Sequence, residues 1–403
     1  MQKDGAVGKP MNRVDGRLKV TGGAKYAAEF PVADAKHAVL VQSAQPKGKI
    51  KSIDAAAAKA LPGVLAIITH ENQGATGNNP LLPNEIQYSG QTFAVVVAET
   101  LETAKQAAKL MRLELDSVEA KADFKAAVGT ATGGRPRNRG DVAAGLAAAS
   151  KKVEAVYVTP TEHHNPMEPH GTIVVPTGDG FTVYDSTQGV QSTAGTVAGR
   201  LGLKPDQVHV VDPFVGGGFG CKGNSWPHTS LCALAARTVG KPVKLSLTRK
   251  QMFTSNGHRP QTRQKETFAA DAGGKLTALV HEGACDQAQR DGFMESTGNA
   301  FNMLYACANA SVVDRPVKLD IPPGTYMRAP GEASGTFGLE TAMDELAYEL
   351  GIDPLEFRLR NYAETDPSSG RPWSSKGLRE CYRQGAERFG WTVRTVDVAD
   401  TDA

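Results

Sequence analysis

The stretch Val-Gly-Gly-Gly-Phe-Gly-Cys-Lys-Gly fills residues 215–223 and lies between segments of different periodicity. A short β-rich run, residues 207–211, precedes it, and a helical pattern over 228–239 and a strand-like run over 243–248 follow it. Glycine tolerates positive φ and close approach, so backbone amides between a strand and a helix can converge on an oxygen-rich or anionic ligand. The pattern therefore predicts a ligand-binding glycine loop, with a tight turn that binds nothing as the alternative.

Two common nucleotide-binding motifs do not fit these glycines. A dinucleotide fingerprint that starts at Gly216 requires glycine or alanine at position 221, and a P-loop requires glycine directly before Lys222. Cys221 stands at that position in both alignments. An unrelated nucleotide-binding oxidoreductase is therefore the weakest of the functional interpretations.

The chain around the loop alternates between helical and extended patterns. Upstream, an alanine-rich helix and three extended segments are predicted at residues 142–149, 152–159, 172–176 and 181–186. Downstream, apolar residues from Phe337 to Leu350 follow the spacing of one helix face. Asp353 and Pro354 are a cap and a first-turn proline, which begin another helix.

An earlier region shows a second, smaller α+β pattern. Its predicted strands and helices are residues 38–41, 54–61, 64–69, 92–98, 100–111 and 113–115. Residues 129–140 hold four glycines, a proline and three arginines without apolar periodicity, as a linker does. The predicted division is a first domain at 1–128, a linker at 129–140, a second domain at 141–391 and a polar tail at 392–403.

The composition restricts the possible partners and the compartment. With 45 basic and 43 acidic residues the net charge is +2, which gives no reason to expect nucleic acid. No run of about 18 apolar residues without charge occurs, so no membrane span is expected. The first ten residues carry neither an apolar signal core nor a twin arginine, so no self-encoded export is expected. The five cysteines form no Cys-x-x-Cys pair, which argues against an iron–sulfur cluster or a disulfide framework.

Four separated segments, in order and spacing, resemble the molybdenum-binding large subunits of the xanthine dehydrogenase and aldehyde oxidase family. They read Glu-His-His-Asn-Pro-Met-Glu-Pro-His at 162–170, Asp-Ser-Thr-Gln at 185–188, Gly-Gly-Gly-Phe-Gly at 216–220 and Tyr-Met-Arg-Ala-Pro-Gly-Glu at 326–332. The opening residues 8–22 are similar to the start of that family's hammerhead domain, so the resemblance extends to about Trp391. The 221–223 sequence and the Arg-Ala-Pro-Gly-Glu motif resemble the bacterial aldehyde-oxidising branch.

The resemblance implies a fold, a cofactor and a set of site residues. The fold would be a hammerhead α/β domain followed by the first molybdenum-cofactor-binding domain, with the second cofactor domain missing. The cofactor would be molybdopterin cytosine dinucleotide, with no residue of this chain bound directly to the metal. Gln188 would approach an oxygen ligand of the molybdenum, and the implied cofactor-binding residues are Gln188, Gly217, Gly218, Phe219, Gly220 and Arg328.

The sequence departs from the family pattern at places that bear on the reaction. Where purine oxidases carry a carboxylate and an arginine, this chain has Gly223 and, at roughly the second position, Ser296, so purine is not the expected substrate. The family's general base is a glutamate far along the second cofactor domain, and no segment here matches it. No catalytic residue is therefore identified in this chain, and isolated activity is not expected.

The resemblance also implies partners and leaves an alternative function open. An iron–sulfur small subunit and a flavin-binding medium subunit would carry the [2Fe-2S] clusters and FAD, and a separate chain could supply the second cofactor domain. The expected substrate is a small aldehyde or a related electrophilic carbon, with water as oxygen source. The expected compartment is the cytoplasm, with periplasmic co-export on a partner's signal as the alternative. The alternative function is a non-catalytic truncated relic or split-gene component that binds partner subunits.

Several polar residues have simpler interpretations than catalysis. Histidines 163, 164 and 170 do not match the spacing of a zinc motif, and a loop network that orders the domain is favoured. Glu332 and Glu340 are placed as helix-start acids are, for reasons of the helix dipole. The sequence leaves open whether Lys222 contacts a phosphate or lies on the surface.

Overall fold

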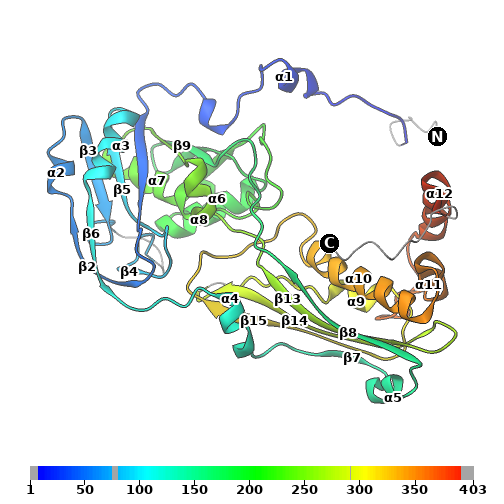
Figure 1. The fold of residues 1–403 in the computed structure, drawn as a ribbon. Coiled ribbons are helices and arrows are strands. Elements are labelled where there is room, and N and C mark those ends of the chain that lie inside the picture. The colour runs from blue at the N-terminus through cyan, green and yellow to red at the C-terminus, as the bar shows by residue number, and fades with distance from the viewer. Residues whose placement is uncertain (1–7, 75–79, 291, 392–403) are drawn as a thin grey trace.

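The computed structural model describes residues 8–74, 80–290 and 292–391. Within these residues the chain forms two lobes, each built on a β-sheet with helices packed against it (Figure 1). The mixture of helices and sheets confirms the predicted α+β class. The predicted polar tail at 392–403 lies outside the described residues.

The first lobe is organised around what we call the large sheet. Its strand order, within the described residues, is β11-β10-β9-β12-β1-β5-β3. The bounds of these strands are β1 (Lys36–Gln42), β3 (Val64–Thr69), β5 (Thr92–Ala98), β9 (Gly171–Pro176), β10 (Phe181–Asp185), β11 (Val208–Val211) and β12 (Val243–Ser246). Each of these seven strands overlaps a predicted extended segment.

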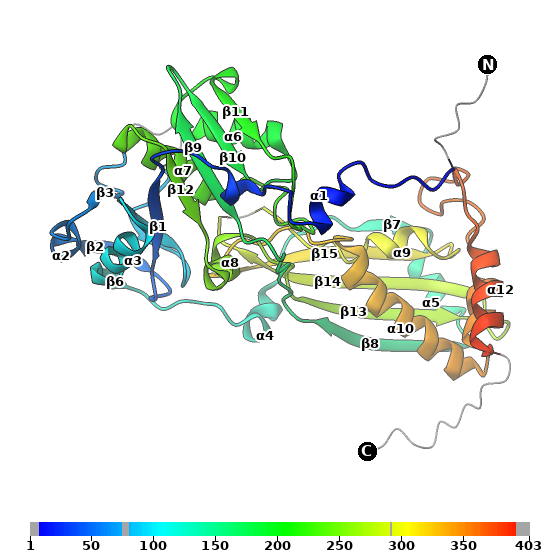
Figure 2. The ribbon, with the colours of Figure 1, turned by 90° about the horizontal axis from the view of Figure 1, so that it is seen from above.

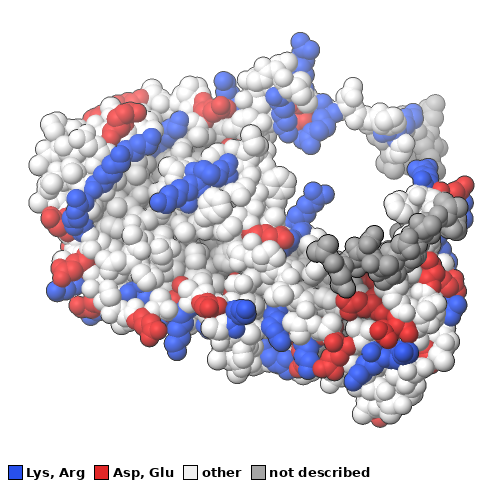
Figure 3. Space-filling model, in the orientation of Figure 1, with Lys and Arg blue, Asp and Glu red and all other residues white. Residues whose placement is uncertain are grey.

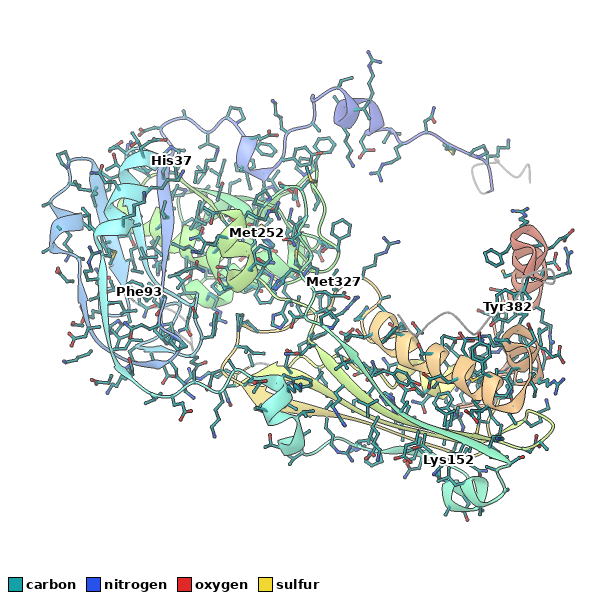
Figure 4. All side chains as sticks on the ribbon, viewed as in Figure 1. His37, Phe93, Lys152, Met252, Met327 and Tyr382 are labelled. Carbon is teal, nitrogen blue, oxygen red and sulfur yellow. The ribbon has the colours of Figure 1, made fainter. Side chains whose placement is uncertain are left out.

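The large sheet joins the two regions that the sequence analysis separated. β1 pairs in parallel with β12, which places His37 opposite Lys244, and pairs antiparallel with β5 on its other side. His37 and Phe93 are marked on this lobe in Figure 4. Strands from residues 1–128 and from residues 141–391 thus share one hydrogen-bonded sheet, and the predicted division of the chain is not a division of the sheet.

Helices cover both faces of the large sheet. The apolar residues of β5 alternate: Val95 and Val97 belong to the core that contains Leu231 of α7 (Pro227–Val239), and Val96 belongs to the core beneath α3 (Leu101–Leu110). This alternation follows from the period of two in a strand. The other helices on this lobe are α2 (Ala56–Lys59), α6 (Val190–Leu201) and α8 (Arg249–Ser255). The core of the first lobe therefore lies in two layers around β5.

A small sheet completes the first lobe, and short helices lie on the connections and against the second lobe (Figure 1). The small sheet has the order β4-β2-β6 within the described residues, with β2 (Gly48–Asp54), β4 (Glu85–Ile86) and β6 (Arg112–Ser117). The short helices are α1 (Gly16–Val20), α4 (Phe124–Ala127) and α5 (Val142–Ala147). Thr100 accepts a hydrogen bond from the backbone N–H of Thr103, so α3 begins where its threonine cap was predicted.

The second lobe is built on what we call the long sheet. Its order within the described residues is β7-β15-β14-β13-β8, and its bounds are β7 (Arg137–Arg139), β8 (Lys151–Thr159), β13 (Thr262–Ala270), β14 (Leu276–Ala288) and β15 (Ala310–Leu319). The helices α9 (Asn299–Met303) and α10 (Glu332–Leu350) lie along one face of this sheet (Figure 2). Buried Leu339, Met343 and Leu346 of α10 pack with Phe268 and Leu279 of the sheet.

Part of the predicted linker at residues 129–140 forms a strand. Arg137–Arg139 forms β7, whose residues pair antiparallel with Ala310–Val312 at the edge of the long sheet. The three residues of β7, two of them arginines, show no alternation of apolar and polar side chains. An edge strand can form without it, because backbone hydrogen bonds hold the strand and little apolar surface is buried. The second lobe therefore begins inside the predicted linker.

The C-terminal part of the described chain ends in two helices. α11 (Pro354–Arg360) begins as predicted, because the Asp353 carboxylate accepts hydrogen bonds from the backbone N–H groups of Leu355 and Glu356. α12 (Leu378–Phe389) lies at the far end of the second lobe, where Figure 4 marks Tyr382.

Among the described residues no helix is both long and apolar enough to cross a membrane. Along the lower edge of Figure 3, acidic and basic side chains lie side by side.

Candidate cofactor-binding site

Residues 215–223, called the glycine loop, run between β11 and α7 in an unusual backbone conformation. Gly217, Phe219 and Gly220 have φ values of +93°, +56° and +116°. Left-handed backbone is uncommon for a residue with a side chain and is found mainly where the surroundings enforce it. The ring of Phe219 is 47% exposed despite its size. The loop thus presents an aromatic side chain at a surface.

Gln188 follows β10 and is bound to the glycine loop at two points. Its backbone N–H donates to the carbonyl of Lys222 at 2.7 Å, and its side-chain oxygen accepts from the backbone N–H of Gly220 at 3.1 Å. The second bond fixes which end of the amide faces the loop. Gln188 is exposed, and its Nε2 group makes no hydrogen bond to another described residue. Two donor hydrogens are therefore available to an external acceptor.

Glycine is required in the loop because other groups occupy the space of a side chain. A Cβ on Gly218 would lie 2.5 Å from the side-chain oxygen of Gln188. A Cβ on Gly220 would overlap the carbonyl oxygen of Tyr326. Both distances are shorter than van der Waals contact allows, so the loop packs directly on Gln188 and on Tyr326.

Residues 326–331, called the arginine loop, form the other side of the site. The backbone N–H of Arg328 donates to the carbonyl of Phe219 at 2.9 Å, which joins the arginine loop to the glycine loop. Ala329 has a φ of +60°. The guanidinium of Arg328 is exposed and forms no ion pair with the described residues. Met327, next to it, lies at the junction of the two lobes in Figure 4.

The predicted site residues are brought together by these contacts. Gln188 meets Gly220 and Phe219 meets Arg328, so segments more than 100 residues apart form one surface. Gly217 and Gly218 lie on the same loop and complete the predicted set. The structure places the residues side by side, and their roles toward a cofactor stay predictions.

Beneath the glycine loop lies a group of buried ionisable side chains. The ammonium of Lys222 is fully buried and forms an ion pair with Glu168 at 2.7 Å. This contact answers the question left open by the sequence, because Lys222 neither lies on the surface nor reaches outward to a phosphate. Burial raises the pKa of Asp185 to about 6 and that of Asp212 to about 7.

Two neighbouring histidines are uncharged for the same physical reason. Burial lowers the pKa of His228 to about 3 and holds the pKa of His170 well below its usual range. Their rings meet edge to face with centroids 5.0 Å apart. Lys222 and Glu168 thus form an ion pair beside two uncharged histidines.

The histidines considered for a zinc site have structural contacts. Nε2 of His164 lies 3.0 Å from the carbonyl oxygen of Tyr326, and His163 packs edge to face on Phe253. Across the described residues, no group of three or more His, Cys, Asp or Glu side chains is arranged to hold a metal ion. Glu340 accepts hydrogen bonds from Tyr305 and forms an ion pair with Arg358.

Sequence reasoning missed Arg259, which orders the arginine loop. Arg259 is 5% exposed, and its Nη2 donates to the carbonyls of Met327 at 2.9 Å and Arg328 at 2.5 Å. Its Nη1 pairs with Glu162. A lone arginine before a strand carries no local signal of this role, because all three partners are distant in the chain.

The fold and the site are of the kind predicted to hold an oxygen-rich or anionic group on a glycine loop. Residues 129–362 match the molybdopterin cofactor-binding domain family, and residues 21–119 match the α/β hammerhead domain of aldehyde oxidase and xanthine dehydrogenase. The chain belongs to the xanthine dehydrogenase and aldehyde oxidase family, as part of a molybdenum-binding large subunit. This finding confirms the resemblance noted in the sequence.

Individual relatives support the same assignment. The chain is 39% identical to the aldehyde oxidoreductase molybdenum-binding subunit PaoC of Escherichia coli K12, over 97% of this chain and 55% of PaoC. It is 29% identical to the putative xanthine dehydrogenase molybdenum-binding subunit XdhA of the same strain, over 96% of this chain and 56% of XdhA. The solved aldehyde oxidoreductase of Desulfovibrio gigas superposes with a TM-score of 0.84 at 25% identity, covering 94% of this chain and 46% of that one. The chain thus spans about half the length of the relatives it matches.

The residues present fit a molybdenum cofactor. A pterin dithiolene with a phosphate tail and metal-bound oxygens offers many acceptors and negative charge. The free amide donors of Gln188, the exposed guanidinium of Arg328 and the amides of the glycine loop are donors of the matching kind. The family and the donor set therefore agree.

Proposed function

We propose that this chain binds molybdopterin cytosine dinucleotide and takes part in the oxidation of aldehydes, or of related electrophilic carbons, with water as oxygen source. The observation that carries the proposal is the orientation of Gln188. Because Gly220 engages the amide oxygen, the NH₂ group is directed away from the loop and toward any acceptor bound there. When bound, the molybdenum centre supplies two-electron oxidation and oxygen transfer from water.

The residues of this chain would bind and orient that group. Gln188 would donate a hydrogen bond to an oxygen of the group, the glycine loop would line it, and Arg328 would face it with its positive charge. Phe219 presents an apolar face that limits water near the reacting carbon. These are binding and positioning roles, which lower the cost of reaching the reactive geometry.

The general base is proposed to come from the second molybdopterin-binding domain. Two carboxylates beside the site already have partners: Glu168 is bound to Lys222, and Glu295 accepts from Gly331 and Ser334. Glu332 directly follows the arginine loop as the first residue of α10, as an acid at a helix start. Proton transfer requires a carboxylate within hydrogen-bond reach of the reacting group. That domain, on the same subunit or on a separate chain, would supply the glutamate.

The electrons are proposed to leave through partner subunits. An iron–sulfur small subunit with [2Fe-2S] clusters and a medium subunit with FAD would accept them, because all five cysteines of this chain lie far apart and are free thiols. We propose assembly in the cytoplasm, with co-export on a partner's signal as the alternative. The names of the relatives describe subunits, which supports a multi-subunit complex.

The test is an assay of the assembled subunit with its partners. Aldehyde-dependent dye reduction in ¹⁸O-labelled water should give an acid that carries the label, and xanthine should give a much slower rate. The low rate with purines is expected because Gly223 provides no carboxylate and packs within reach of the Tyr326 hydroxyl. Equal rates with xanthine would contradict the substrate assignment. No turnover with any partner would favour a non-catalytic component that only binds other subunits.

A further inference from the structure

The segment 162–170 contains two glutamates, and each is joined to one of the two loops of the site. The Glu168 side-chain oxygen Oε2 accepts from the backbone N–H of Gly216 and from the ammonium of Lys222, both at 2.7 Å. The backbone N–H of Glu168 donates in turn to the carbonyl of Gly216 at 3.1 Å. One carboxylate therefore ties the start of the glycine loop to its end.

The ion pair also connects to Gln188. The carbonyl of Lys222 accepts from the backbone N–H of Gln188 at 2.7 Å, so the residue that closes the loop also holds the amide donor in place. The side chain of Lys222 is fully buried and that of Glu168 is 13% exposed. A buried ion pair is sensitive to loss of one partner, because the other charge is then left without solvation.

Glu162 acts on the arginine loop in the corresponding way. It pairs with Nη1 of Arg259, whose Nη2 donates to the carbonyls of Met327 and Arg328. The backbones of Glu162 and Arg259 also exchange hydrogen bonds of 3.2 and 2.9 Å. Each glutamate therefore fixes a cation that is at most 5% exposed, and that cation holds one of the two loops.

We infer that Glu162 and Glu168 are positioning residues that fix the conformations of the two loops. They thereby place Gln188 and Arg328 where these side chains can contact the cofactor. This inference rests on the proposed function for its purpose, but the positioning itself is a property of this chain. It assigns a role to the segment 162–170, whose polar residues otherwise face no ligand. The two glutamates act through other residues and touch no reacting atom.

The first test is hydrogen–deuterium exchange on the full chain without cofactor, read by mass spectrometry. Lys222→Met keeps the length of the side chain and removes its charge. We expect amides of residues 216–223 and of Gln188 to exchange at least tenfold faster, with residues 326–331 unchanged. Glu162→Gln should give the converse pattern. Equal loop exchange in Lys222→Met and the unmodified chain would overturn the inference.

The matched control is Lys47→Met, which removes another lysine from a buried carboxylate. Lys47 pairs with Asp320 at 2.8 Å, and Asp320 is 1% exposed at the side chain. This variant should accelerate exchange near Asp320 and leave residues 216–223 as they were. If it loosened the glycine loop as much as Lys222→Met does, the effect would be global destabilisation and the inference would fail.

A double variant separates positioning from stability. Glu168→Gln combined with Lys222→Met removes both charges of the pair, so neither is left without its partner, and the melting temperature should return to within a few degrees of the unmodified chain. We expect residues 216–223 to remain fast in exchange, and molybdenum per assembled subunit to fall at least fivefold. Recovery of loop protection together with stability would overturn the inference. If the unmodified subunit held no molybdenum, the proposed function would fail while the exchange result still decided the positioning role.

Discussion

The side-chain oxygen of Gln188 accepts a hydrogen bond from the backbone N–H of Gly220 at 3.1 Å. This contact joins the end of β10 to the glycine loop and leaves the NH₂ group of Gln188 exposed. A side-chain amide can serve as donor or acceptor, and the partner at Gly220 selects the donor end for an external ligand. The ability of Gln188 to donate a hydrogen bond to a ligand thus depends on the backbone N–H of Gly220 in the glycine loop.

Replacing Gly220 by alanine should displace the glycine loop. Gly220 has a φ of +116°, and a Cβ would overlap the carbonyl of Tyr326. Gly220→Ala should lower the free energy of unfolding by about 2–4 kcal/mol and break the Gln188 contact. Chemical denaturation measures the first effect. Gly199→Ala is the control, because a Cβ there meets open space within α6 and should be neutral or slightly stabilising. Equal stability of the two variants would contradict the described packing.

Asp185→Asn should make the protein more stable at neutral pH. Burial raises the pKa of Asp185 to about 6, so its contribution to stability is fully present below about pH 4 and is lost as the pH rises through about 6. The amide stays neutral and can still accept from Thr229. From pH 5 to pH 7.5, the free energy of unfolding of the variant should rise relative to that of the unmodified chain by about 1 kcal/mol.

Two other groups bear on this comparison. His228, with a pKa of about 3, loses stability as the pH falls and works in the opposite direction, but it is present in both proteins. Burial and, to a smaller extent, the charge of Asp185 raise the pKa of Asp212 to about 7, so removal of that charge adds to the gain of the variant in the same direction. A difference for Asp185→Asn that stays constant from pH 5 to pH 7.5 would contradict the raised pKa.

The cysteines should differ sharply in their reactivity. Cys381 on α12 is exposed, whereas Cys221, Cys232, Cys285 and Cys307 are buried. A small thiol reagent should label one thiol per chain rapidly in the folded protein and all five after unfolding. Cys381→Ser should abolish the fast phase. Rapid labelling of any thiol in that variant would show that a cysteine described as buried is accessible.

The local parts of the fold could be predicted from the sequence. Strands β3 and β5 were predicted with the bounds that they have, because their apolar runs are continuous and flanked by turn residues. The caps at Thr100 and Asp353 were predicted from residue type alone. In each case the signal lies within a few residues of the feature.

Of the long sheet, β8 was predicted to within one residue at its start, but its central strands β13 and β14 were not. In β13 the inward-facing residues include Gln264 and Glu266, which are buried at 0% and 1% exposure. In β14 the inward His281 is also fully buried, between Glu266 and Asp314. Polar residues on the buried face remove the apolar alternation by which a strand is predicted. The pairing of β1 with β12 was missed because it depends on residues about 200 positions apart.

The site also contains features that could be predicted from the sequence and features that could not. The glycine loop could be predicted because close packing demands glycine, and Gln188 and Arg328 followed from the family resemblance. The roles of Arg259 and of the Glu168 and Lys222 pair depend on contacts between distant segments, which a single sequence does not display. The loops were predictable, and the residues that hold them were not.

The central claim is that Gln188 and Arg328 hold a molybdenum cofactor, and it is tested by the molybdenum and pterin content of the assembled subunit. The unmodified subunit should carry close to one molybdenum and one pterin per chain. Gln188→Ala and Arg328→Ala should each reduce both contents severalfold, while Gln191→Ala, at an exposed glutamine three residues further along, should retain them. Unchanged molybdenum content in both site variants would contradict the assignment.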